Sequence, residues 1–373
     1  MNKLHSPESL RGIACIAVVF SHLFGVFFPQ LHNFYESSLP KYEIAESIYN
    51  SPFTFFYSGT GAVFVFFALS GYVLTLSSLK AKESVKRFWE SVIKRYPRLA
   101  IPAIGSCLFM YLALHINIDV SRTSEWFQTV KLANYSLFDA LYTGAIGAFA
   151  FGSQKYNPAL WTMRIELIGS FVIYFACLLQ VKPMFKHLFL LLIAIVSFKL
   201  SLVPMLGILS FIVGHYFYFY KKSLPESLSI IIFIIGLYLC GAHNSSQSYV
   251  LFSNLLGEKT YDILNFVGGF LIVLAVLKSR IIDKILDKKP LVYLGKISFA
   301  IYLVHITVIY LVCIPIFNFL LEKSYTFASS AILSSIISFI FILGISSIYS
   351  KYIDDISIRF SNNLARIFIK KSS

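Results

Sequence analysis

Arg11 and His22 are ionisable residues inside the first long apolar segment, LRGIACIAVVFSH. They are eleven residues apart, and eleven helical steps of about 100° bring the second side chain within about 20° of the first. Both side chains are therefore expected on one helix face, about 16 Å apart along the axis. Such groups need a polar cavity or a partner in a membrane. The spacing predicts an inward-facing site. The alternative is one helix–helix hydrogen bond for His22 and an Arg11 that reaches the interface.

Arg95 and Arg98 are three residues apart in KRYPRLAIP, where a basic connection meets the next apolar block. We expect the helix to start here, because proline is tolerated in a first turn and Pro97 would occupy it. Two guanidinium groups beside a helix N-terminus form a site for phosphate oxygens. The pair could therefore anchor the phosphates of coenzyme A. The alternative is ordinary cytoplasmic positive charge or contact with anionic lipid.

Glu166 lies five residues after Trp161 in ALWTMRIE. We expect this carboxylate at the outer end of a membrane helix, where it needs a partner, and His22 is expected at a comparable depth. A carboxylate that orients an imidazole helps it to act as a base. The alternative is an interfacial glutamate beside a tryptophan anchor.

Tyr302 and His305 share a helix face in LGKISFAIYLVH because they are three residues apart. They could line a cavity or form hydrogen bonds between helices. Ser70 and Trp161 are further candidates for the lining of such a cavity.

The segments that must position these residues are apolar blocks of membrane-spanning length. The chain has 373 residues, of which 57% are hydrophobic and 13% charged, whereas a soluble domain has about 25% charged residues. We predict an all-α polytopic membrane protein with about ten transmembrane helices. The predicted spans are 9–29, 59–79, 99–116, 165–181, 185–200, 203–220, 227–243, 262–278, 297–320 and 326–350. A shorter apolar stretch, 136–152, is expected to be re-entrant or interfacial.

Charge placement predicts the topology. With both termini in the cytoplasm, 24 of the 32 basic residues lie on the cytoplasmic side, as the positive-inside rule requires. The net charge of +14 is thereby explained without a nucleic-acid partner. We predict a membrane domain over residues 1–350 and a short basic cytoplasmic tail over 351–373. The five cysteines lack metal-binding spacing, and no metal is expected.

Five segments, in this order, resemble the integral membrane acyltransferase family 3, which includes bacterial polysaccharide O-acetyltransferases. They are LRGIACIAVVFSH, GAVFVFFALSGY, RYPRLAIP, LWTMRIE and LGKISFAIYLVH. The chain departs from the family pattern at Val65, where many members have a polar residue, and at Thr162 and Met163, which replace a Ser-Leu pair.

The resemblance implies an acyl-CoA donor on the cytoplasmic side and a sugar hydroxyl as acceptor. It implies that Arg11 and His22 are required for activity and that Arg95 and Arg98 contact the donor. Together with the residue patterns, it predicts a bacterial cytoplasmic (inner) membrane enzyme that moves an acetyl or other acyl group from acyl-CoA to a cell-surface polysaccharide or its lipid-linked precursor. His22, Arg11 and Glu166 are the candidate catalytic residues, and His22 would be a general base or a nucleophile.

Two other functions fit the same pattern. A transporter of a glycan intermediate or an anion would also have buried ionisable groups and a basic mouth. An enzyme that acylates a lipid headgroup would use the same donor site. The expected partners are acyl-CoA, a glycan or lipid-linked sugar, and membrane lipids.

Overall fold

The computed structural model describes the chain except for residues 1–4, 33–37, 81–83 and 371–373. Lys82 of the basic connection and the last three residues of the predicted tail therefore lie outside the described residues. The described residues are mainly helical and contain no strand, which confirms the all-α prediction.

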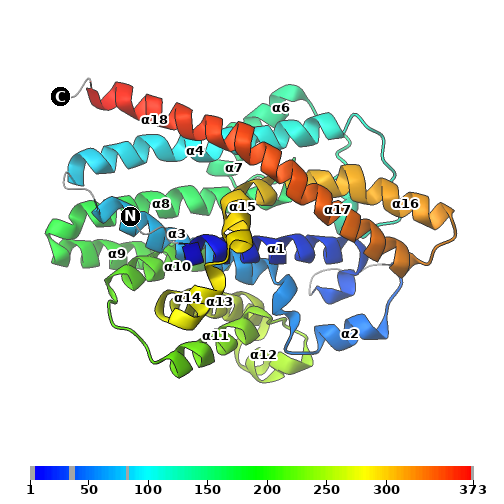
Figure 1. Ribbon diagram of the computed structural model, residues 1–373, viewed down its shortest axis with the longest axis horizontal. Helices are drawn as coiled ribbons and strands as arrows, with labels where there is room; N and C mark the ends of the chain where they lie inside the picture. Colours follow the sequence, from blue (N-terminus) through cyan, green and yellow to red (C-terminus); the bar gives the residue numbers. More distant parts are fainter. Residues whose placement is uncertain (1–4, 33–37, 81–83, 371–373) are drawn as a thin grey trace.

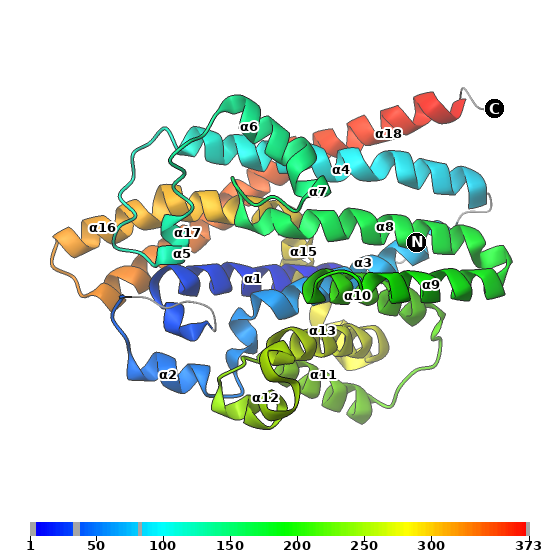
Figure 2. The ribbon, with the colours of Figure 1, turned by 180° about the vertical axis from the view of Figure 1, so that it is seen from behind.

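Most helices run along one direction, and the start of α1 and the last turns of α18 lie in the same half of the bundle (Figures 1 and 2). The long helices are α1 (His5–Phe27), α3 (Gly59–Leu79), α4 (Ser84–Ala113), α8 (Thr162–Leu178), α10 (Leu202–Phe219), α13 (Thr260–Lys278), α15 (Lys289–Val308) and α17 (Phe327–Tyr349). Shorter helices of the bundle are α9 (Pro183–Ser197), α11 (Glu226–Cys240), α16 (Ile314–Glu322) and α18 (Asp355–Lys370).

The remaining helices belong to the connections. They are α2 (Glu43–Tyr49), α5 (Glu125–Gln128), α6 (Leu137–Tyr142), α7 (Ala148–Ala150), α12 (Val250–Leu256) and α14 (Arg280–Leu286). Short 3-10 or π-helical turns are labelled η: η1 (Pro29–Leu31), η2 (Thr54–Tyr57), η3 (Thr143–Gly147), η4 (Pro158–Trp161), η5 (Leu179–Val181), η6 (Gln247–Tyr249), η7 (Gly257–Lys259), η8 (Ile309–Cys313) and η9 (Ser350–Asp354).

Seven helical segments of the described chain are long and apolar enough to cross a membrane. They are His5–Phe27, Gly59–Leu79, Pro158–Val181, Leu202–Phe219, Gln247–Lys278, Lys289–Glu322 and Phe327–Ile369. The other predicted spans fall on α4, which carries several charges, and on α9 and α11, which are shorter. The count of ten spans and the cytoplasmic termini stay predictions. The stretch predicted at 136–152 forms α6, η3 and α7.

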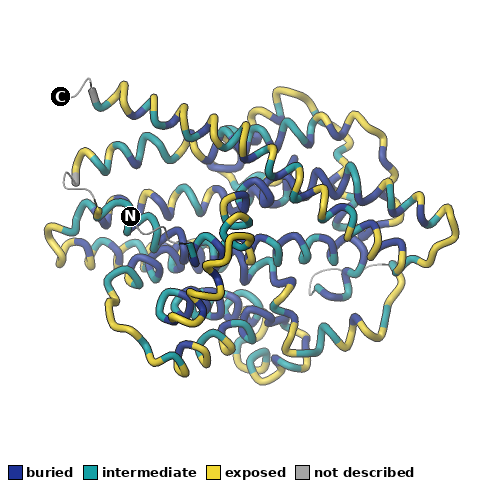
Figure 3. Tube along the Cα trace, viewed as in Figure 1, coloured by how far each residue is buried: buried dark blue, intermediate teal, exposed yellow. Residues whose placement is uncertain are grey.

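The buried residues concentrate in the middle of the bundle, whereas the helix ends and outer helices are more exposed (Figure 3). Helix α1 lies at this centre and packs most extensively against α15. The two backbones approach closely at Gly12 and Gly295. A β-carbon at Gly295 would lie 2.0 Å from the carbonyl oxygen of Glu8, and one at Gly12 would lie 2.6 Å from the amide nitrogen of Gly295. Only glycine permits this crossing, because any larger residue would push the helices apart.

The C-terminal residues continue helix α17 through the turn η9 into α18. Helix α18 packs along α4, and the two run side by side (Figures 1 and 2). The region predicted as a tail is therefore a helix that covers one side of α4 over its described length.

Candidate active site

A cavity of about 450 Å³ lies among α1, α3, α4, α8, α15 and the junction of α17 with α18. This volume is within the usual range for small-molecule sites, about 300–1,000 Å³. The charged side chains that line it are Glu8, Arg11, Arg95, Arg98, Glu166, Lys296, Asp354 and Asp355. The cavity thus joins four basic groups with four acidic groups.

Helix α1 places Arg11 and His22 on the side that faces α15, as their spacing predicts. Arg11 lines the cavity, and the charged groups nearest to it include Glu166 and Arg95. His22 lies three turns farther along α1 and contacts His305 of α15. The close crossing at Gly12 and Gly295 brings α1 against α15 next to Arg11.

Arg95 and Arg98 both line the cavity, but the predicted helix start beside them is wrong. Helix α4 begins at Ser84, so both arginines and Pro97 lie in the interior of the helix. Lys86, Arg87 and Lys94 are predicted in a connection, whereas all three lie in helical turns of α4, a helix that packs against α18. An anion at these arginines would therefore meet their side chains alone, because no free amide groups of a helix N-terminus lie beside them.

Glu166 pairs with Arg95, so the expected pairing with His22 is wrong. The Nη2 group of Arg95 donates to Oε1 of Glu166, and Oγ of Ser70 donates to the same oxygen over 2.8 Å. The Nε group of Arg95 also donates to Oγ of Ser170 over 2.7 Å. Glu166 lies one turn after the start of α8 at Thr162, on the side that faces α3 and α4.

The imidazole of His22 faces that of His305, with 2.9 Å between Nδ1 of His22 and Nε2 of His305. The other nitrogen of His305, Nδ1, lies 3.0 Å from the carbonyl oxygen of Ile301. His22 also stacks on Trp126, whose ring is nearly parallel at 12° and lies 5.4 Å away, centroid to centroid. His305 is fully buried and His22 is half-buried.

Tyr302 lies between the charged cavity and the histidine pair. It lines the cavity, and its ring centroid is 6.3 Å from that of His305. Its hydroxyl donates to the carbonyl oxygen of Ala159 over 2.9 Å and lies 3.0 Å from Oγ1 of Thr162. These bonds hold the Tyr302 ring in place. Because His305 follows Tyr302 by three residues on α15, the histidine pair lies about one helical turn beyond this wall of the cavity.

The four predicted lining residues divide into two groups. Ser70 and Tyr302 line the cavity, whereas Trp161 and His305 are not among its lining residues. Trp161 is partly buried and packs against the apolar cluster formed around α3, α8 and α10. His305 acts on the site through its contact with His22.

Several residues of the site were missed from the sequence. Glu8 could have been found, because it lies three residues before Arg11 on the same helix. Lys296 lies in the segment LGKISFAIYLVH, but this segment contains no charged residue three or four positions away that would have indicated a site at Lys296. Asp354 and Asp355 were assigned to the tail, and Trp126 lies in a polar connection. No local pattern marks these three residues.

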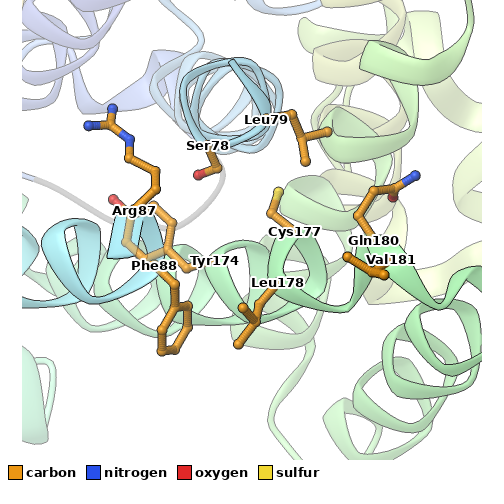
Figure 4. Close-up of a pocket in the computed structure, with 9 residues that line it drawn as sticks. All are labelled: Ser78, Leu79, Arg87, Phe88, Tyr174, Cys177, Leu178, Gln180 and Val181. Carbon is orange, nitrogen blue, oxygen red and sulfur yellow. The ribbon is translucent and has the colours of Figure 1, made fainter. Parts of the chain in front are cut away.

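A second, smaller hollow of about 210 Å³ lies where the end of α3 meets α4 and α8. Figure 4 shows the guanidinium group of Arg87 directed away from Cys177 and Leu79, which lie on the far side of the hollow. The hollow has a mainly apolar lining and carries no acid–base pair. In the described part of the chain, no three His, Cys, Asp or Glu side chains are grouped as a metal site.

A family model described as an acyltransferase domain, acyltransferase family 3, matches residues 4–351. The chain belongs to acyltransferase family 3. The match covers nearly the whole chain, so the acyltransferase assignment applies to the helical bundle itself. This assignment favours an enzyme over the alternative of a transporter. No curated protein and no solved structure matches the chain.

Proposed function

We propose that this acyltransferase moves an acyl group, most simply acetyl, from acyl-CoA to a hydroxyl of a cell-surface polysaccharide or its lipid-linked precursor. The observation that carries the proposal is the cavity that gathers Arg11, Arg95, Arg98 and Lys296 next to a pair of histidines. An anionic donor and a basic imidazole are what acyl transfer from a CoA thioester requires.

The phosphates of CoA would bind the cationic side of the cavity. Arg98 and Lys296 are exposed within it, so their charged groups are available without breaking the pair of Arg95 with Glu166. Arg11 is about 16 Å along α1 from His22, at about 1.5 Å per residue. The elongated pantetheine arm of CoA would cover that distance and bring its thioester past Tyr302 to the histidines.

His22 would perform the chemistry by one of two routes. As a general base, it removes the proton from the acceptor hydroxyl while the oxygen forms a bond to the thioester carbon. As a nucleophile, it first takes the acyl group on its own nitrogen and then passes it to the hydroxyl. In both routes the carbon–sulfur bond breaks, and the CoA thiolate leaves and takes up a proton.

The positive-inside asymmetry supports a cytoplasmic position for the cavity, because Glu8 and Arg11 of its lining lie in the first turns of α1, near the predicted cytoplasmic N-terminus. Cytoplasmic acyl-CoA would then enter from that side. The acceptor hydroxyl would approach His22 from the opposite side, near Trp126. The corresponding location is the cytoplasmic (inner) membrane of a bacterium.

The test is acetyl transfer by purified protein in lipid nanodiscs, measured with radiolabelled acetyl-CoA and with surface glycan isolated from a strain that lacks the gene. The wild-type protein is expected to release CoA and to label the glycan, and His22→Ala is expected to lose both activities. His215→Ala is the matched control, because His215 is a buried histidine of α10 whose Nδ1 lies 2.8 Å from Oγ1 of Thr75. Full activity in His22→Ala would contradict the proposal, and label in the lipid fraction would identify a lipid acceptor instead.

A further inference from the structure

The hydrogen bonds of the two histidines determine where their protons are. Nδ1 of His305 lies 3.0 Å from the carbonyl oxygen of Ile301. A carbonyl oxygen can only accept a hydrogen bond, so Nδ1 of His305 must carry a proton. A neutral imidazole has one protonated nitrogen. Nε2 of His305 therefore presents a lone pair toward His22.

This lone pair dictates the form of His22. The N–N contact of 2.9 Å between the two rings holds one proton, and it must come from His22 because Nε2 of His305 has none to donate. Nδ1 of His22 is therefore protonated, and its lone pair lies on Nε2. That nitrogen is directed away from His305, and the nearly parallel ring of Trp126 restrains the plane of the imidazole.

We propose that His305 is a positioning residue that sets the tautomer of His22 and thereby makes Nε2 of His22 the reactive atom. Histidine bases in enzymes are commonly oriented by a carboxylate. Here the orienting chain is an imidazole followed by a backbone carbonyl, while the carboxylate of Glu166 is bound by Arg95. The inference rests on the proposed function and holds for both routes, since a base and a nucleophile each need that lone pair.

His305 also stabilises the charge that develops during the reaction. When Nε2 of His22 takes the proton of the acceptor hydroxyl, His22 becomes an imidazolium ion. Its Nδ1–H group then donates a charge-assisted bond to His305, and such bonds are about twice as strong as neutral ones. His305 keeps its own proton on Nδ1 throughout. Among the described residues, the titratable groups near the pair include Tyr302 and His32.

Two amide substitutions at position 305 test the inference. In His305→Gln the amide oxygen reaches the place of Nε2 and can accept from Nδ1 of His22, whereas in His305→Asn the amide reaches only the place of Nδ1. We expect His305→Gln to keep kcat within about 10-fold of the wild type. We expect His305→Asn to lose about 100-fold or more, which is the size of a general-base contribution. KM for acetyl-CoA should stay unchanged in both, because His305 does not line the donor cavity.

The same two substitutions at His215 are the controls, since they disturb another buried histidine without touching the pair. Equal losses in His305→Gln and His305→Asn would overturn the inference, and so would a wild-type kcat in His305→Asn. These two variants have similar polarity, so a merely structural role of His305 would not separate them.

A spectroscopic measurement separates this inference from the proposed function. The protein is labelled with ¹⁵N-histidine, and the His22 signals are those that disappear in His22→Gln. The wild-type ¹⁵N shifts should show His22 protonated on Nδ1, and a His22 protonated on Nε2 would refute the inference even in an active enzyme. Conversely, full acetyl transfer by His22→Ala would refute the role of His22 while leaving the tautomer measurable.

Discussion

The pair of Arg95 with Glu166 allows a quantitative prediction. Each side chain is 14% exposed, and Ser70 also donates a hydrogen bond to the Glu166 carboxylate. Loss of one partner from a buried ion pair costs about 3–5 kcal/mol, and partial exposure to the cavity favours the lower end. We expect Arg95→Gln to reduce the free energy of unfolding by about 3 kcal/mol and Glu166→Gln by about 2 kcal/mol. The double variant should be about 3 kcal/mol more stable than the sum of these losses predicts, because it leaves no unpaired charge.

The assay is denaturant unfolding in detergent, with size-exclusion chromatography to check that each variant is folded beforehand. Lys155 and Asp139 provide the matched control, since this pair is 41% and 31% exposed. The cycle of Lys155→Gln and Asp139→Asn should give a coupling energy below about 1 kcal/mol, as is usual for exposed pairs. A coupling energy for Arg95 and Glu166 as small as that of the control would refute the reasoning.

Three further predictions concern other parts of the molecule. Gly295→Val should separate α1 from α15, because its β-carbon would lie 2.0 Å from the carbonyl oxygen of Glu8. Crosslinking of cysteines placed on the two helices should then fail, and efficient crosslinking would count against this prediction. Arg98→Gln should raise KM for acetyl-CoA about 10- to 100-fold, which corresponds to the loss of one charge-assisted hydrogen bond, and should leave kcat unchanged. The control is Arg122→Gln, at an exposed arginine, which should change neither constant. His243 lies in the connection after the end of α11 at Cys240. Burial lowers the pKa of His243 to about 3 from an ordinary 6.5, so this group remains neutral when folded and its contribution to stability is lost as pH falls below 6.5. His243→Leu should therefore reduce the acid-dependent slope of unfolding by about 1.4 kcal/mol per pH unit, and an unchanged slope would exclude His243 as its source.

The helical bundle could be predicted because apolar blocks of span length are a local signal. The segment predicted at 59–79 coincides with α3, and every other predicted block falls on a helix of the structure. The start of α4 could not be predicted from residues 84–94. Their charges are typical of a connection, and the helix that they begin packs against α18, which follows about 270 residues later in the chain.

The site shows the same division between local and distant signals. The common face of Arg11 and His22 follows from helix geometry alone, and Tyr302 and His305 were found in the same way. The partners of these residues could not be derived, because they depend on which helices meet. Glu166 was assigned to His22 on depth, whereas Arg95 binds it, and the stacking of Trp126 on His22 has no sequence signal.

The first helix and the start of the last helix meet in one cavity, because Glu8 and Arg11 of α1 line it together with Asp354 and Asp355. This arrangement has a consequence for biogenesis. During synthesis α1 enters the membrane first, yet His22 must wait 283 residues for His305, and Arg95 must wait 71 residues for Glu166. Until then these polar groups remain without their final partners in the membrane, at a cost of a few kcal/mol each. The cavity is therefore complete only after the last helices are translated, and a ribosome that stalls before α15 leaves a nascent chain that cannot form the histidine pair.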